Sequence, residues 1–191
     1  METIAAIGDR RSIRKFSSQP VPDSMLTELL EAARKAPSAG NSQPWSFVVA
    51  TGELKRTVIQ GMEAQAPKVA QLGMQAEGFK MSIEALDQAP VAILVFNTGN
   101  QPVPGGGSAV YEYMRIAGIQ SIGAAIENLI LRACDLGLGS VWVGWVAIAD
   151  EEIRRSLGRS DELVAAIALG YPAESPAARP RKGLDEIVEW R

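Results

Sequence analysis

Two short basic segments lie near the ends of a chain that is otherwise acidic. RRSIRKF at residues 10–16 holds four Lys or Arg residues and ARPRKG at 178–183 holds three, whereas the whole chain has a formal net charge of −3. Neither segment contains an acid. In extended backbone, Arg10, Ser12 and Arg14 would share one face, because side chains alternate along a strand. Two guanidinium groups beside a hydroxyl suit a phosphate or the anionic edge of a ring.

The second basic segment repeats the spacing of the first. Arg179 and Arg181 are two residues apart, and Pro180 between them restricts the backbone. Arg11 adds a further guanidinium to the first segment. The two segments together suggest that both ends of the chain converge on one polyanionic ligand. A solvated charged surface is the competing interpretation, and the residue pattern alone leaves both open.

A polar stretch, APSAGNSQPW at residues 36–45, is the other candidate for ligand contact. It gathers small hydrogen-bonding side chains just before an aromatic one: Ser38, Asn41, Ser42, Gln43 and Trp45. Asn and Gln amides donate and accept at once, which suits a flavin or the edge of a nucleobase. A helix end followed by a polar turn is the simpler interpretation, and it accounts for Pro37 and Gly40.

The absence of histidine narrows the possible chemistry. Ser-His-Asp and Cys-His nucleophiles, and zinc or non-haem iron sites with His ligands, need a residue type that the sequence lacks. No acid cluster has a spacing that suggests a magnesium site. We therefore expect no metal, and a reactive centre supplied by a bound cofactor. The acidic charge balance disfavours nucleic acid as a partner.

Cysteine usage and hydropathy indicate the compartment. The single cysteine, Cys134, cannot form an intramolecular disulfide, which fits a reducing environment. It lies among apolar residues of a helical pattern, so we interpret it as an inert core thiol. The apolar runs have the length of strands rather than of membrane spans. We expect a cytoplasmic protein without a membrane partner.

Helical and strand patterns alternate along the chain, which predicts one domain at 1–191 with a small sheet and many helices. The helix at 116–139 is apolar on nearly every face, so we expect burial all round, in a large core or against another subunit. Gly144 lies within an apolar strand pattern, where a ligand could approach the backbone closely. The expected elements are helices over 21–40 and 116–139, two helices over 53–88, strands over 45–51, 90–96, 140–148 and 162–172, and a loop over 97–113.

Four segments, in this order, resemble the nitroreductase family of FMN-dependent oxidoreductases. They are RRSIRKF, APSAGNSQPW, GAAIENLILRACDLGLGSVWVGW and the closing LGYPAE…RPRKGLDEIVEW. The resemblance implies a three-layer α+β fold with a small central mixed sheet, a long buried central helix and an intertwined homodimer. It further implies tightly bound FMN at the subunit interface, with NAD(P)H as the reductant.

The resemblance also assigns residues to the FMN site. It implies contacts to FMN from three groups: Arg10, Arg11, Ser12 and Arg14; Pro37, Ser38, Ala39, Asn41 and Gln43, some from the partner subunit; and Val143 and Gly144, along the ring through their backbone. Arg181, with Arg179, would return to the phosphate. The implied reaction alternates between NAD(P)H and a nitroaromatic, quinone or similar flat acceptor in a ping-pong cycle. It requires no catalytic side chain, because the chemistry takes place on the flavin.

Three alternatives stay open at this point. The chain could be a flavin-binding dimer without turnover, such as a sensor or carrier; a member of another flavin-dependent reductive branch of the family; or a dimeric scaffold whose basic segments bind a protein. Segments 61–79 and 97–115 should set the choice of acceptor, but they carry no motif that identifies it. The first of them does not match the lid of the iodotyrosine-dehalogenating members, so we do not expect deiodination.

Overall fold

Four strands form one sheet in the order β1-β2-β4-β3. The computed structural model describes residues 2–73, 76–99, 105 and 107–191. The central strands are the most apolar ones: every residue of β2 is buried, which agrees with the continuous apolar run in its sequence. The strands are β1 (Trp45–Ala50), β2 (Val91–Asn97), β3 (Gly139–Val143) and β4 (Glu162–Gly170).

The expected mixed sheet was wrong, because all three pairings between the named strands are antiparallel. The parallel pairing in the described residues is a single isolated bridge between Ser12 and Ser140. An alternation of helices and strands in the sequence is compatible with parallel and with antiparallel pairing. The pairing is antiparallel when the segment between two strands returns to the end of the sheet where the first strand finished, and parallel when it crosses to the opposite end. The three helices between β1 and β2 return to the same end, so the two strands run in opposite directions.

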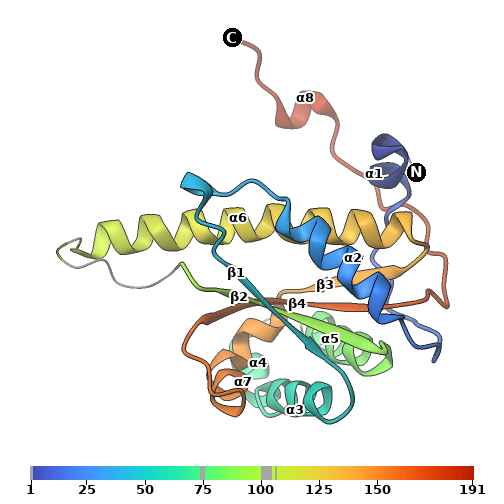
Figure 1. Ribbon diagram of the computed structural model, residues 1–191, viewed down its shortest axis with the longest axis horizontal. Coiled ribbons are helices and arrows are strands. Elements are labelled where there is room, and N and C mark those ends of the chain that lie inside the picture. The colour runs from blue at the N-terminus through green and yellow to red at the C-terminus, as the bar shows by residue number, and fades with distance from the viewer. Residues whose placement is uncertain (1, 74–75, 100–104, 106) are drawn as a thin grey trace.

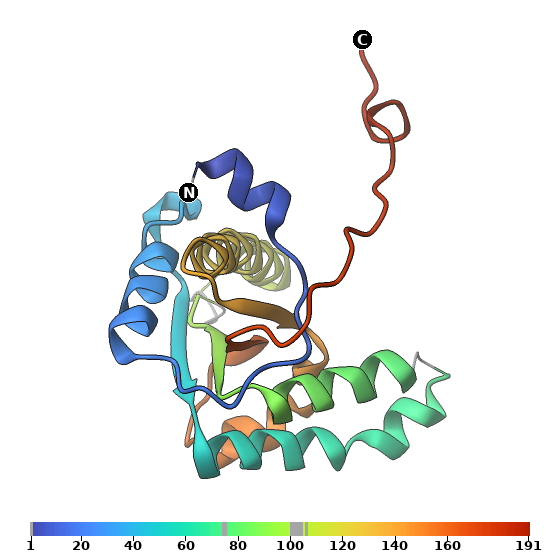
Figure 2. The same ribbon diagram turned by 90° about the vertical axis from the view of Figure 1, so that its right-hand side faces the viewer.

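Helices cover both faces of the sheet, which confirms the three-layer α+β arrangement (Figure 1). The long helix α6 (Gly107–Asp135) and α2 (Asp23–Arg34) pack on one face. The opposite face carries α3 (Gly52–Glu63), α5 (Ala76–Gln88), the 3₁₀ turn η2 (Trp145–Ala149) and α7 (Asp150–Ser156), with the short α4 (Ala66–Gln71) between α3 and α5. The view in Figure 2 separates these layers, with α6 seen end-on.

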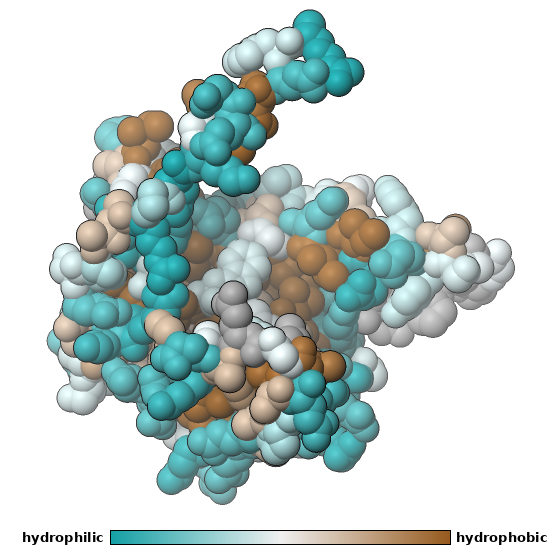
Figure 3. All heavy atoms as spheres, turned by 180° about the vertical axis from the view of Figure 1, so that it is seen from behind, coloured by the Kyte–Doolittle hydropathy of each residue, from teal (hydrophilic) through white to brown (hydrophobic). Residues whose placement is uncertain are grey.

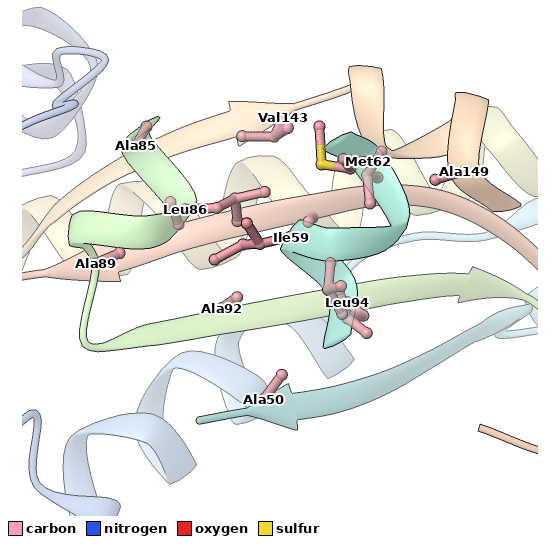
Figure 4. Packing of buried hydrophobic residues seen from close by; sticks show 14 of the residues in the cluster. Ala50, Ile59, Met62, Ala85, Leu86, Ala89, Ala92, Leu94, Val143 and Ala149 are labelled. Carbon is pink, nitrogen blue, oxygen red and sulfur yellow. The ribbon is translucent and has the colours of Figure 1, made fainter. Parts of the chain in front are cut away.

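The layer of shorter helices is held to the sheet by apolar side chains (Figure 4). Ile59 and Met62 from α3 and Leu86 from α5 pack toward Leu94 of β2 and Val143 of β3. All five are buried. Burying one such side chain is worth about 1.5–3 kcal/mol relative to leaving it exposed. This packing therefore fixes β3, and with it the backbone that follows at residue 144.

Several expected boundaries differ from the structure. Residues 107–113 belong to α6 rather than to a loop, while 100–104 and 106 lie outside the described residues. The strand expected over 140–148 ends at Val143, and the segment 53–88 holds three helices instead of two. Within this chain, helix α6 is buried toward α2 and the sheet, whereas Ile116 is exposed; burial of that residue against another subunit stays a prediction.

The two ends of the chain meet beside the sheet. Ser17 N donates to Tyr171 O at 2.9 Å, and Ala173 N donates to Lys15 O at 2.9 Å. Beyond these contacts the C-terminal tail, residues 175–191, projects from the body and carries the short helix α8 (Leu184–Ile187), which Figure 2 shows apart from α1 (Thr3–Asp9). Figure 3 shows hydrophobic residues among the hydrophilic ones of this tail.

Candidate functional site

The two basic segments line one cavity of about 400 Å³. This confirms that both ends of the chain converge in space. Ser12 is held in extended backbone by its bridge to Ser140 of β3, and Ile13 N donates to Ser140 O at 2.9 Å. The cavity walls bring together most of the predicted donors: Arg10, Arg11, Ser12, Arg14, Arg179 and Arg181.

The five arginines of this cavity differ in their existing contacts. Arg11 donates to Gly8 O at 2.6 Å and to Arg10 O at 2.9 Å, so it caps the end of α1. Arg10 lies 3.9 Å from a carboxylate oxygen of α6, that of Glu127. Within the described part of the chain, the remaining three make no ion pair with an acid: Arg14, Arg179 and Arg181. Arg14 Nη1 also donates to the backbone oxygen of Ser12 at 3.1 Å. No acid of the described residues therefore competes with an anion for these three guanidiniums.

A larger cavity of about 790 Å³ adjoins the basic one, because Arg14 and Arg179 line both. Its remaining wall comes from β3, η2 and α5 and is mostly apolar. The volume lies within the range of about 300–1,000 Å³ typical of small-molecule sites. The residues beyond the two arginines are Glu77, Gly78, Met81, Ser82, Ala85, Val141, Trp142, Gly144, Trp145 and Ile148.

Gly144 leaves the wall of this cavity open. It lies just after β3 with φ −78°, a value that any residue adopts, so its backbone does not require glycine. A Cβ placed on it would meet no atom within 4 Å. The neighbouring Val143 side chain points the other way and is buried in the core. Backbone, rather than side chain, therefore faces the cavity at residue 144.

The polar stretch at 36–45 lies away from the basic cavity. Its 3₁₀ turn η1 (Ala39–Asn41) rests on α6, where Ala39 N donates to Ser121 Oγ at 3.2 Å. Gln43 N donates to Ser38 Oγ at 3.0 Å, and the turn lines a separate cavity of about 340 Å³ together with Tyr113. One chain therefore does not bring all of the predicted residues together. Pro37, Ser38, Ala39, Asn41 and Gln43 form a second polar surface.

Cys134 lines a small cavity of about 210 Å³ that also borders Arg10 and Arg11. Burial raises the pKa of its thiol, and the nearby charge of Asp9 acts in the same direction. The thiol is therefore a weaker nucleophile at neutral pH than an ordinary cysteine. This agrees with the interpretation of Cys134 as inert.

Of the residues that line the larger cavity, sequence reasoning selected Arg14, Arg179 and Gly144 and none of the others. Trp142 and Trp145 flank Gly144 in the sequence, and two indoles beside a glycine were a usable signal for a flat ligand. The residues from α5, such as Met81, follow a helical pattern that looks like core packing. No pattern in the sequence marks them as cavity residues.

Known proteins identify the family. The nitroreductase family model matches residues 7–171. A protein of Methanothermobacter thermautotrophicus, provisionally named NADH dehydrogenase/NAD(P)H nitroreductase, is 32% identical over 98% of this chain and 86% of its own. The 5,6-dimethylbenzimidazole synthase of Rhodospirillum rubrum is 32% identical over 86% and 79% of the two chains. A crystal structure in complex with FMN from Desulfovibrio desulfuricans aligns with a TM-score of 0.77 at 26% identity, over 100% and 97%.

The chain therefore belongs to the nitroreductase family, and its fold is the nitroreductase fold. Within the described residues, no cluster of three or more Cys, Asp or Glu could hold a metal ion. In the same residues, no helix is both long enough and apolar enough to cross a membrane.

Proposed function

We propose that the protein is an FMN-dependent oxidoreductase that takes hydride from NAD(P)H and passes it to a flat acceptor such as a nitroaromatic or a quinone. The observation that carries this proposal is the pair of adjoining cavities, one lined by five arginines and the other by two indoles. A phosphate would match the first and a flat ring the second. The names of the relatives and the FMN in the related crystal structure support the same assignment.

The residues of the two cavities fit FMN in type and placement. Arg14, Arg179 and Arg181 would hold the phosphate, since their guanidiniums lack acid partners in the described chain. The open backbone at Gly144 leaves room for a ring to lie against the strand end. Bound FMN would supply the two-electron chemistry that no side chain here can perform.

The apolar wall of the larger cavity would receive the second substrate. Trp142, Trp145 and Met81 offer flat or adaptable surfaces that stack on aromatic rings and keep water out. No histidine is present to move a proton, so the side chains bind and orient while solvent supplies protons. We infer that segments around α5 and the start of α6 set acceptor choice.

We further propose that two copies of the chain complete each site. The polar turn η1 lies on α6 apart from the basic cavity, so it would reach the flavin of the partner subunit. Large apolar side chains that a second copy could cover are exposed on several elements: Ile4, Ile7, Ile116, Trp142, Leu184, Ile187 and Trp190. The cytoplasmic location and the single domain at 1–191 remain predictions from the sequence.

The test is an anaerobic absorbance titration of the purified protein. Protein as isolated, or after addition of FMN and removal of unbound flavin, should show the visible flavin band. NADH or NADPH should bleach that band, and a nitroaromatic or quinone should restore it. Protein that retains no flavin after this treatment would overturn the assignment of the arginines. Flavin that neither NADH nor NADPH bleaches would favour a binding protein without turnover.

The related synthase gives a second activity to check with the same preparation. Its name reports formation of 5,6-dimethylbenzimidazole, so aerobic turnover mixtures should be analysed for that product alongside nitro and quinone reduction. Accumulation of dimethylbenzimidazole with loss of FMN would replace the proposed reaction. Repeated bleaching and recovery of the flavin band, with FMN intact, would support it.

A further inference from the structure

Glu174 joins the C-terminal tail to the first basic segment. Its Oε1 accepts hydrogen bonds from two successive backbone amides, Arg14 N at 2.6 Å and Lys15 N at 3.1 Å. These partners are 160 and 159 residues away in the sequence. A carboxylate that accepts from backbone N–H groups makes charge-assisted hydrogen bonds, which are the stronger kind.

The contact of Glu174 with the amides of Arg14 and Lys15 lies where it can affect the geometry of the basic cavity. The first segment is tied to β3 through Ile13 and to the stretch before the tail through Lys15 and Ser17. Glu174 is the last of these cross-links that the described residues show before the tail leaves the body. Arg179 and Arg181 follow five and seven residues later, on the cavity wall.

The negative charge of Glu174 is unfavourable for the binding of an anion in the basic cavity. A carboxylate next to guanidiniums lowers the positive potential that an anion would meet. The carboxylate makes no ion pair with an arginine in the described structure; its recorded partners are the two amides. The two amide hydrogen bonds therefore point to a role in backbone geometry, which the unfavourable effect of the charge on the cavity would oppose.

We propose that Glu174 is a positioning residue for the anion cavity. By holding the amides of Arg14 and Lys15, it keeps the first segment extended and sets where the tail begins. The guanidiniums of Arg14 and Arg179 then face the same cavity. The inference rests on the proposed FMN function, because FMN is the anion by which it is tested.

The test compares three substitutions at this one position in the full-length protein. Gln keeps the length and an acceptor oxygen but removes the charge, Asp keeps the charge but is one methylene shorter, and Ala removes both. The dissociation constant of FMN is measured on apoprotein by flavin fluorescence. Hydrogen exchange of the segment 12–17 is measured on apoprotein without FMN. Glu151→Ala is the matched control, because Glu151 lies exposed on α7 and pairs with Arg155.

Positioning predicts that Glu174→Ala and Glu174→Asp weaken FMN binding about tenfold or more, from two lost amide bonds. Glu174→Gln keeps an acceptor oxygen but loses the charge assistance, so it should weaken FMN binding less than the Ala and Asp variants do. Exchange of residues 12–17 should speed up most in the Ala and Asp variants. If the charge matters instead, Gln and Ala both bind FMN more tightly and Asp resembles wild type. That result, or unchanged binding in all three, would overturn the proposal.

The design separates this inference from the proposed function. Wild-type apoprotein that fails to bind FMN contradicts the function, while the exchange rates still report whether Glu174 holds the segment. Urea midpoints of the apoproteins show whether each variant is folded. Should the Ala variant fail to fold, the comparison of Asp and Gln with wild type still distinguishes the two explanations. Positioning predicts that Asp weakens FMN binding, whereas the charge explanation predicts that Asp leaves it unchanged and Gln tightens it.

Discussion

At the residue scale, Gly144 has free space beside its backbone, on the cavity side. A larger residue at this position should therefore leave the fold intact but obstruct the site. A Val side chain there would meet no protein atom within 4 Å of its Cβ, and φ −78° suits it. We therefore expect Gly144→Val to leave the free energy of unfolding of the apoprotein, measured by urea denaturation, unchanged within about 0.5 kcal/mol. The same side chain would occupy the space of a bound ring, so FMN affinity should fall at least tenfold.

The control for this prediction is Ala70→Val, because Ala70 lies exposed on α4, which lines neither of the two adjoining cavities. Fluorescence titration of both variants with FMN would distinguish a local block from a general effect of added bulk. Equal FMN affinity in Gly144→Val and wild type would show that no ligand approaches the backbone at this point.

Cys134 gives a prediction about pH. Because burial raises the pKa of its thiol, the thiolate fraction at a given pH is lower than in an ordinary cysteine. We expect iodoacetamide to alkylate Cys134 more slowly than glutathione at neutral pH. The rate should rise only at more alkaline pH than for glutathione, and urea should remove the difference. Alkylation as fast as glutathione in the native protein would contradict an inert thiol.

The residues also show what the sequence could predict. The two groups of arginines could be predicted, because the spacing of hydrogen-bond donors within each segment is visible in the local sequence. What the local sequence does not show is the ligand that both segments would bind. Glu174 could not be predicted, because its role depends on contacts 160 residues away. Only the family resemblance indicated that η1 would lie apart from the arginines of its own chain. Spacing along the sequence does not show whether a turn contacts a ligand bound to its own subunit or to the partner subunit.

At the element scale, helix α6 approaches β2 closely at one point. A Cβ on Gly118 would lie 2.6 Å from Oδ1 and 2.8 Å from Nδ2 of Asn97, which is fully buried at the end of β2. The Asn97 side chain is also held, because its Oδ1 accepts from Gly99 N at 3.0 Å. Glycine at 118 is thus required by the approach of the two elements and not by its backbone angles.

We expect Gly118→Ala to destabilise the protein by about 1–3 kcal/mol, as overpacking in a rigid interior does. This cost should exceed the gain of about 0.8–1.0 kcal/mol from replacing a helical glycine by alanine. Urea denaturation of Gly118→Ala, Asn97→Ala and the double variant measures the coupling. The double variant should lose less stability than the sum of the single variants, because Ala at 97 leaves room for the new methyl group.

Additive losses would show that Asn97 is not the neighbour that excludes a side chain at 118.

The length of α6 was under-predicted from the sequence for a related reason. Residues 107–113 follow a glycine-rich stretch that looks like loop, yet the helical backbone continues through them. Local propensity could not show this, because the outcome depends on packing across the whole helix.

At the scale of the whole molecule, the separated halves of the site predict complementation between two damaged chains. Arg14→Ala should weaken FMN binding from one side, and Asn41→Ala from the η1 side. If the site combines two copies, a heterodimer of these variants holds one intact site and one doubly damaged site. We expect purified heterodimer to bind FMN at half the wild-type stoichiometry with wild-type affinity, whereas each homodimer binds weakly.

Differently tagged chains, co-expressed and purified over both tags, provide the heterodimer for this titration. Weak binding at every site in the heterodimer would mean that Arg14 and Asn41 act on the same FMN from the same chain, or that η1 does not reach it. Sedimentation velocity on the same samples reports whether the chain forms the dimer that the experiment assumes.

The basic cavity takes its walls from the first and the last parts of the polypeptide, and this order has a consequence during synthesis. Arg14 is synthesised early, whereas Arg179 and Arg181 follow it by more than 160 residues. An incomplete or prematurely terminated polypeptide would therefore have half of the phosphate cradle and would retain cofactor poorly. On the proposed function, capture of FMN would therefore follow the synthesis of residue 181.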